Sequence, residues 1–134
     1  MPERLTFDSE AILAYYLGEN GGEMVRDSLE KVKNGVIEGY INILNLTEVY
    51  YIMLRVDQKL AEEKQRNLRL FGLKIVPVND DGLWREAAQI KSKHSLSLAD
   101  AFAVATARML KSKLVVGNDR EFNGLNVQLL RIRH

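Results

Sequence analysis

The amino-acid sequence predicts an α/β domain, in which two layers of helices enclose a central, mainly parallel sheet of four to five strands. Two observations predict this three-layer α/β/α sandwich. Short apolar segments typical of buried strands alternate along the chain with longer segments of helical periodicity. The 134 residues also contain no repeat, linker or low-complexity tract, so we expect a single domain over residues 1–134.

Five short segments are predicted as strands because they are rich in β-branched and other apolar residues. They cover residues 5–7, 36–43, 73–78, 114–116 and 127–132. Pro77 closes the third segment, as expected of a residue that cannot donate a hydrogen bond to a sheet. Helical segments separate most of these strands, which favours parallel pairing.

Apolar residues spaced three and four positions apart predict helices between the strands. The predicted helices cover residues 9–17, 23–33, 46–53, 58–71, 80–93 and 97–110. Gly18, Gly35 and Gly72 end three of them. Alternating alanines in the last helix mimic a strand, but its length and its strong helix formers favour a helix.

The composition excludes several classes of protein. The chain has no Cys and two His, so disulfides, thiolate metal sites and a typical zinc site are excluded. No apolar run approaches the ~20 residues that span a bilayer, and no signal-peptide region precedes the first strand. We therefore expect a cytoplasmic protein without membrane association. Basic residues between 55 and 74 favour a solvated helix face over a surface for a phosphate backbone.

Four acidic residues are the candidate functional residues. Asp8 directly follows the first strand, and Asp119 follows the fourth strand by three residues. Glu48 and Asp100 are expected in the first turns of two helices, where the helix dipole favours a carboxylate. The carboxyl ends of parallel strands form one edge of the sheet, and ligands bind there. We therefore expect all four carboxylates to face this edge.

Each acid also has a local structural explanation. Asp8 could cap the following helix, and Asn118 with Asp119 could form a turn. Capping boxes could explain Asn45 with Glu48, and Ser97 with Asp100. The functional hypothesis depends on the whole set, because clustered carboxylates cannot all stay ionised without a compensating cation. Oxygen ligands without Cys or His favour Mg²⁺ or Mn²⁺.

Four stretches of the sequence carry a resemblance to a known family. They are Phe-Asp-Ser-Glu-Ala-Ile-Leu at 7–13, Asn-Leu-Thr-Glu-Val-Tyr-Tyr at 45–51, Ser-Leu-Ala-Asp-Ala-Phe-Ala-Val-Ala-Thr-Ala at 97–107 and Val-Val-Gly-Asn-Asp-Arg-Glu-Phe at 115–122. In this order they resemble the PIN-domain ribonucleases, which include the toxins of VapC-type toxin–antitoxin pairs. The resemblance spans almost the whole chain, and the third and fourth stretches are the more specific ones.

The resemblance implies a PIN-like fold and metal-dependent endonucleolytic cleavage of RNA. By resemblance, Asp8, Glu48, Asp100 and Asp119 match the four acidic positions of the family. Asp8 and Asp100 would be the principal metal ligands, and Asp119 would bind metal directly or through water. Glu48 would bind a second ion or orient the attacking water. The implied partners are RNA, a cognate antitoxin and a second copy of the chain, with the helix faces near Tyr50 and Met53 available for a homodimer.

Several smaller polar groups accompany the acids. The hydroxyls of Ser9 and Thr47 are candidate partners of the carboxylates, and local bonding at the helix starts is the alternative. The family often has Ser or Thr two residues before the last acid, where this chain has Gly117. Asn118 is the candidate for the missing polar contact.

Two other functions are compatible with a domain of this size. A phosphoacceptor signalling domain would need paired acids after the first strand and a Lys after a late strand, and the sequence shows neither. A non-catalytic binding or assembly module would keep the fold and would bind its partners equally well with the acids neutralised.

Overall fold

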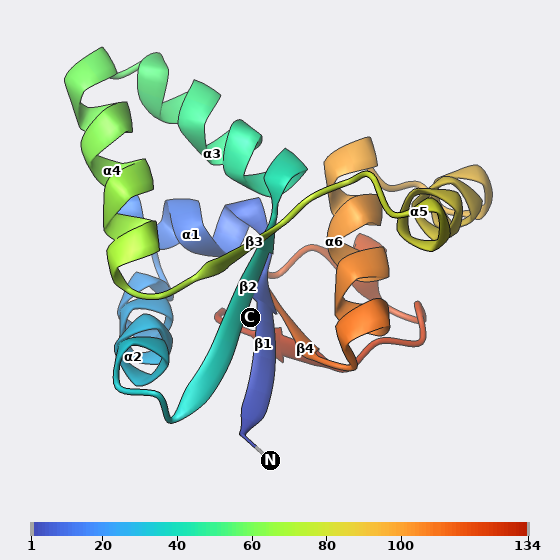
Figure 1. Ribbon diagram of the computed structural model, residues 1–134. Coiled ribbons are helices and arrows are strands. Elements are labelled where there is room, and N and C mark those ends of the chain that lie inside the picture. The colour runs from blue at the N-terminus through green and yellow to red at the C-terminus, as the bar shows by residue number, and fades with distance from the viewer. Residues whose placement is uncertain (1, 134) are drawn as a thin grey trace.

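Five strands form one parallel sheet in the order β3-β2-β1-β4-β5. Figure 1 shows the protein as a computed structural model, which describes residues 2–133. The strands are β1 (Glu3–Phe7), β2 (Ile37–Asn42), β3 (Lys74–Val76), β4 (Lys113–Val116) and β5 (Leu129–Arg131). The predicted parallel sheet is confirmed, and each strand overlaps its predicted segment.

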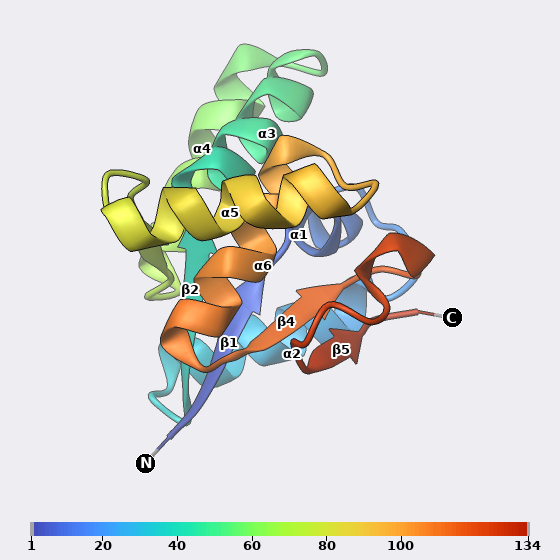
Figure 2. The same ribbon diagram turned by 90° about the vertical axis from the view of Figure 1, so that its right-hand side faces the viewer.

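Helices cover both faces of this sheet. They are α1 (Ser9–Tyr16), α2 (Gly22–Lys33), α3 (Ile43–Leu54), α4 (Gln58–Leu70), α5 (Asp81–Lys93) and α6 (Leu98–Leu110), with a 3₁₀ turn η1 (Arg120–Phe122) after β4. Figure 2 shows α5 and α6 in front of the sheet and α1 and α2 behind it. The predicted three-layer α/β/α architecture is therefore confirmed.

The strands place their side chains alternately in two hydrophobic cores. Leu5 and Phe7 of β1 and Val115 of β4 lie in the core that includes α1 and α2. Leu114 and Val116 lie in the other core, with α5 and α6. Both faces of β4 are buried, which explains the continuous apolar sequence from Leu114 to Val116. Packing on both faces also fixes the carboxyl end of this strand.

The start of α3 differs from the capping box predicted for Asn45 and Glu48. The helix begins three residues earlier, directly after β2, and Asn42 is its N-cap. The buried Asn42 side chain accepts a hydrogen bond from the Leu44 N–H at 2.9 Å and donates one to the Thr106 hydroxyl at 2.9 Å. Contact with α6 therefore fixes the helix start, and Glu48 lies in the second turn, not the first.

The face predicted for a homodimer is partly wrong. Met53 is 1% exposed and packs in the chain's own core. The Tyr50 hydroxyl donates to Glu62 of α4 at 2.5 Å. Both residues thus join α3 to α4, and the homodimer itself stays a prediction.

None of the helices in residues 2–133 has the length and apolar character needed to cross a membrane.

Gly22 lies where α2 passes closest to α1. A Cβ at this position would lie 2.6 Å from the Ala14 carbonyl oxygen and 3.0 Å from Tyr15 Cα. Backbone atoms cannot yield as a side chain can, so we expect Gly22→Ala to lower the free energy of unfolding by about 1–3 kcal/mol. Chemical denaturation measures this change.

Gly82→Ala is the matched control for this substitution. Gly82 also lies in the first turn of a helix, and the nearest atom to an added Cβ is Asp80 Oδ1 at 3.2 Å. Because Ala favours the helix, we expect a change of at most about 1 kcal/mol, in the stabilising direction. Equal destabilisation by the two substitutions would contradict the close packing of α2 on α1.

Candidate metal centre

Asp8 lies at the carboxyl edge of the sheet, as its place after β1 predicts. Its backbone N–H donates to the Val115 carbonyl at 3.0 Å, which fixes the residue beside the end of β4. Asp8 occupies the N-cap position of α1, but its side chain makes no capping hydrogen bond. The capping explanation is therefore wrong for Asp8. The residue is 2% exposed, and its Oδ1 has no hydrogen-bond partner among residues 2–133.

Asp100 and Glu48 reach the same edge from two helices. Asp100 is the third residue of α6, and its backbone N–H donates to the Ser97 hydroxyl at 3.1 Å. The predicted N-cap at Ser97 is therefore confirmed. Glu48 projects from the second turn of α3 and is partly buried. Its position comes from the early start of α3 and does not depend on capping.

Asp119 lies beside Asp100, together with an acid that the sequence reasoning missed. The Asp119 side chain accepts a hydrogen bond from the Glu121 N–H at 2.9 Å and caps η1. The turn chemistry predicted for this residue is confirmed. Each of Asp100, Asp119 and Glu121 offers a carboxylate oxygen that lies within 4.8 Å of the other two. Glu121 belongs to the Asp-Arg-Glu-Phe stretch, but only the 3₁₀ turn brings it to Asp100.

The electrostatics of Asp8 and Asp100 link the four predicted carboxylates. Burial raises the pKa of Asp8 well above its ordinary value, and the charge of Asp100 raises it further. The Ser9 backbone N–H lowers this pKa, while Glu10 and then Glu48 raise it.

Asp100 shows the same pattern. Burial raises the pKa of Asp100, the Ser97 hydroxyl lowers it, and the charges of Glu48 and Asp119 raise it. The structure thus brings Asp8, Glu48 and Asp119 within electrostatic reach of Asp100.

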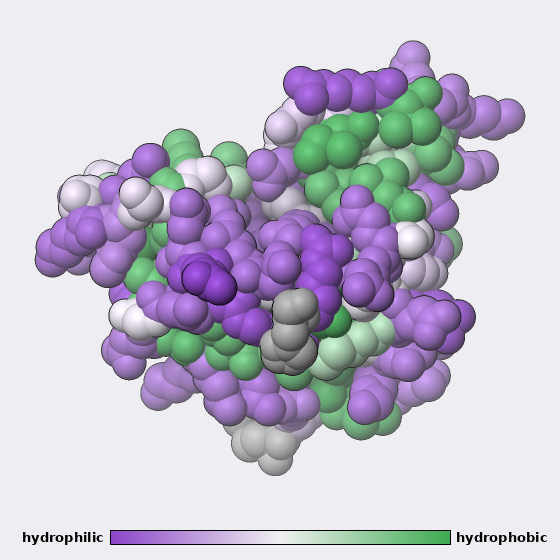
Figure 3. Space-filling view, turned by 180° about the vertical axis from the view of Figure 1, so that it is seen from behind, coloured by the Kyte–Doolittle hydropathy of each residue, from purple (hydrophilic) through white to green (hydrophobic). Residues whose placement is uncertain are grey.

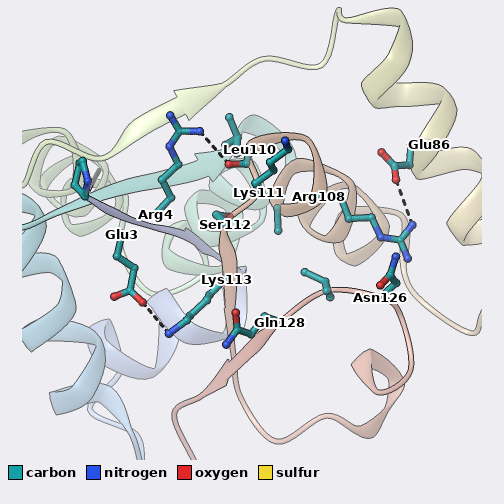
Figure 4. A pocket seen from close by; sticks show the side chains of 13 residues that line it. Glu3, Arg4, Glu86, Arg108, Leu110, Lys111, Ser112, Lys113, Asn126 and Gln128 are labelled. Atoms are coloured by element: carbon teal, nitrogen blue, oxygen red, sulfur yellow. Dashed lines mark hydrogen bonds and ion pairs between the residues drawn. The ribbon is translucent and has the colours of Figure 1, made fainter.

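A hollow of about 350 Å³ opens beside Asp8, Glu48 and Asp100. Its polar lining consists of Asp8, Ser9, Glu10, Glu19, Glu48, Ser97 and Asp100. A wider hollow of about 780 Å³ lies at the amino ends of the strands and is basic (Figure 4). Three of its cations are already paired, Arg4 with Glu38, Arg108 with Glu86 and Lys113 with Glu3. In the acidic hollow, by contrast, Asp8, Glu48 and Asp100 have no ion-pair partner among residues 2–133, while Glu10 and Glu19 pair with Arg133. This hollow lies at the edge where ligands bind.

The side chain of Asn45 in α3 contacts both α1 and α6. The sequence did not predict this role of Asn45. The residue is fully buried, and its side-chain N–H₂ donates to the Ser9 hydroxyl and to the Ala99 carbonyl, both at 3.2 Å. The Ser9 hydroxyl in turn donates to the Asn45 carbonyl at 3.3 Å. Ser9 thus helps to position α1 against α3 beside the carboxylates.

The other two predicted polar residues, Thr47 and Asn118, are exposed. The Thr47 side chain is exposed and its hydroxyl donates to the Ile43 carbonyl at 2.7 Å, so the local explanation holds for Thr47. Asn118 is exposed beside Gly117.

The chemistry of the donors fits a hard divalent cation. All the acidic side chains here offer oxygen, which Mg²⁺ and Mn²⁺ prefer. The buried, unpartnered Oδ1 of Asp8 needs either a proton or a cation nearby. The fold and this site define an α/β protein with an acidic centre at the carboxyl edge of a parallel sheet.

The sequence model of the PIN domain matches residues 5–127, so the chain belongs to the PIN-domain family. Comparison with curated proteins gives no match. The strand order also differs from the 2-1-3-4-5 order of flavodoxin-like phosphoacceptor domains, so the chain does not have the fold of that alternative.

Solved structures share this fold at low sequence identity. VapBC2 from Rickettsia felis, bound to a promoter DNA fragment, has a chain with a TM-score of 0.75 and 15% identity, covering 96% of this chain and 98% of that one. A chain of FitAcB from Neisseria gonorrhoeae has a TM-score of 0.68 and 19% identity, covering 96% of this chain and 97% of that one. A chain of PAE2754 from Pyrobaculum aerophilum has a TM-score of 0.68 and 18% identity, covering 98% of this chain and 90% of that one. The likeness establishes the fold over nearly the full length of the chain.

Proposed function

We propose that the protein is a metal-dependent endoribonuclease and acts as the toxin of a toxin–antitoxin pair. The observation that carries this proposal is the buried carboxylate of Asp8, whose Oδ1 has no hydrogen-bond partner among residues 2–133, beside other acids at the ligand-binding edge of the sheet. A purely structural Asp in this place would be expected to have hydrogen-bond partners, because an unsatisfied buried group destabilises the fold.

Asp8, Asp100 and Asp119 would hold the ion, and Glu121 lies close enough to Asp119 to assist. Bound there, Mg²⁺ or Mn²⁺ would supply a nucleophilic water at neutral pH and neutralise charge developing on the phosphate oxygens. Glu48 faces the same hollow from α3 and can accept a proton from the attacking water or orient it. Ser97 and Asn45 hold the helices that carry Asp100 and Glu48.

A cognate antitoxin is the protein partner that we propose. The solved structures of similar fold include a toxin–antitoxin complex from Klebsiella pneumoniae. On this chain, Tyr51, Leu54 and Val56 at the end of α3 expose 40–62% of their surface. Seen from behind, apolar side chains gather over α3 and α4 (Figure 3). Such a patch favours a protein partner.

The class of reaction is tested by incubating the purified protein with mixed single-stranded RNA. We expect cleavage with Mn²⁺, loss of cleavage with excess EDTA and recovery when Mn²⁺ is restored. Products are resolved on denaturing gels. Cleavage that persists in EDTA, or intact RNA under all three conditions, would contradict the proposal and favour a non-catalytic module.

A further inference from the structure

The carboxylate of Glu10, which the proposed function does not use, lies against Gly117 at the end of β4. A Cβ added to Gly117 would overlap the Glu10 carboxylate, with Cδ only 2.5 Å away. Glu10 belongs to the first turn of α1 and lines the same hollow as Asp8, Glu48 and Asp100. The carboxylate therefore fills the space that a side chain at position 117 would take.

The opposite end of the chain holds Glu10 in this place. Arg133 donates to Glu10 Oε1 at 2.6 Å and to the Asn20 carbonyl at 3.1 Å. The Arg133 side chain is only about a fifth exposed, and the neighbouring Ile132 packs closely against Gly21. Among residues 2–133, Oε1 is the Glu10 oxygen that accepts a hydrogen bond, which leaves Oε2 available to a ligand.

The backbone conformation at position 117 does not require glycine. Its φ is not in the left-handed region, unlike that of five other glycines. Alanine would fit the backbone here, and the Glu10 carboxylate is the obstacle. Gly117 is thus the residue that allows a long acidic side chain from α1 to reach the edge of the sheet beside Asp8.

We propose that Glu10 is a positioning residue of the metal centre, held by Arg133 over Gly117 so that its carboxylate binds the hydrated cation through water. This proposal rests on the metal centre proposed above. Mg²⁺ and Mn²⁺ prefer oxygen ligands, and Mg²⁺ in particular keeps several waters when it is bound. A nearby carboxylate can accept hydrogen bonds from these waters. Loss of such an outer partner typically weakens metal affinity 10–100-fold.

Isothermal titration of Mn²⁺ into the full chain measures this role without any RNA. We expect Glu10→Gln, which keeps the shape and removes the charge, to weaken Mn²⁺ binding by about tenfold. Glu19→Gln is the matched control, because Glu19 lines the same hollow and lies 3.6 Å from the same Arg133. We expect its affinity within about twofold of wild type, since it lies away from Gly117.

Gly117→Ala tests the same carboxylate from the other side. The new methyl group should displace the flexible Glu10 side chain and weaken Mn²⁺ binding by a similar factor. Because both substitutions act through one group, Gly117→Ala combined with Glu10→Gln should be no weaker than either alone. Thermal melts of each variant confirm that the fold is intact.

Three results would overturn the proposal. Wild-type affinity in Glu10→Gln, with a lower melting temperature, would mean that the ion pair only fastens the C-terminal segment. Equal weakening in Glu19→Gln would mean that any nearby charge suffices. Fully additive effects of the two substitutions would separate Gly117 from Glu10. Each leaves the proposed function standing, whereas absence of Mn²⁺ binding in the wild type would remove both proposals.

Discussion

Asp8→Asn is expected to lower RNA cleavage by on the order of 10³-fold, equivalent to ~4 kcal/mol of transition-state stabilisation. The substitution keeps the shape of the side chain and removes the charge that would hold the cation. In the metal-free protein, the same change should raise the free energy of unfolding by about 1–3 kcal/mol. The reason is that burial and the charge of Asp100 both oppose the ionisation of Asp8, and Asn carries no charge.

Activity and stability should therefore move in opposite directions for this one substitution. Cleavage is measured by initial rates with Mn²⁺, and stability by chemical denaturation in EDTA. Asp57→Asn is the control, because Asp57 caps α4 through the Leu60 N–H at 2.9 Å and Asn caps equally well. It should leave both quantities nearly unchanged. An Asp8→Asn variant that cleaves RNA at the wild-type rate would show that the acidic cluster is not the active site.

The sequence sufficed to predict which edge of the sheet carries the acids. Asp8 and Asp119 follow strands, and in a parallel sheet all strands end at one edge. That rule needs only the order of elements along the chain, which hydrophobic periodicity supplies. The same holds for Ser97, whose capping of α6 depends on residues three positions away.

Features that depend on contacts between residues far apart in the chain could not be predicted from the sequence. The start of α3 is fixed by the hydrogen bond from Asn42 to Thr106, 64 positions further along the chain. The place of Glu10 depends on Arg133, 123 positions away. No local pattern distinguishes Glu10 from an ordinary first-turn acid of α1, because helices favour such residues there in any case.

The last prediction concerns Mn²⁺ and pH together. The folded-state pKa values of Asp8 and Asp100 lie above the ordinary value of 3.8. Above that value, and up to the raised pKa values, the folded metal-free protein binds more protons than the unfolded chain does. Its free energy of unfolding therefore falls as pH rises through this window, and the cost of the ionised carboxylates is fully present above the window.

A bound cation compensates these charges, and binding requires the ionised carboxylates. We therefore expect Mn²⁺ at about 100 times its dissociation constant to stabilise the protein by about 2.7 kcal/mol near neutral pH. At the same Mn²⁺ concentration near about pH 5, competition from protons should make the stabilisation smaller. Thermal melts with Mn²⁺ or EDTA at the two pH values measure the difference, and Asp8→Asn should lose most of the Mn²⁺ effect at both. A Mn²⁺ effect that is equal at the two pH values, or that survives in Asp8→Asn, would place the bound ion away from Asp8 and Asp100.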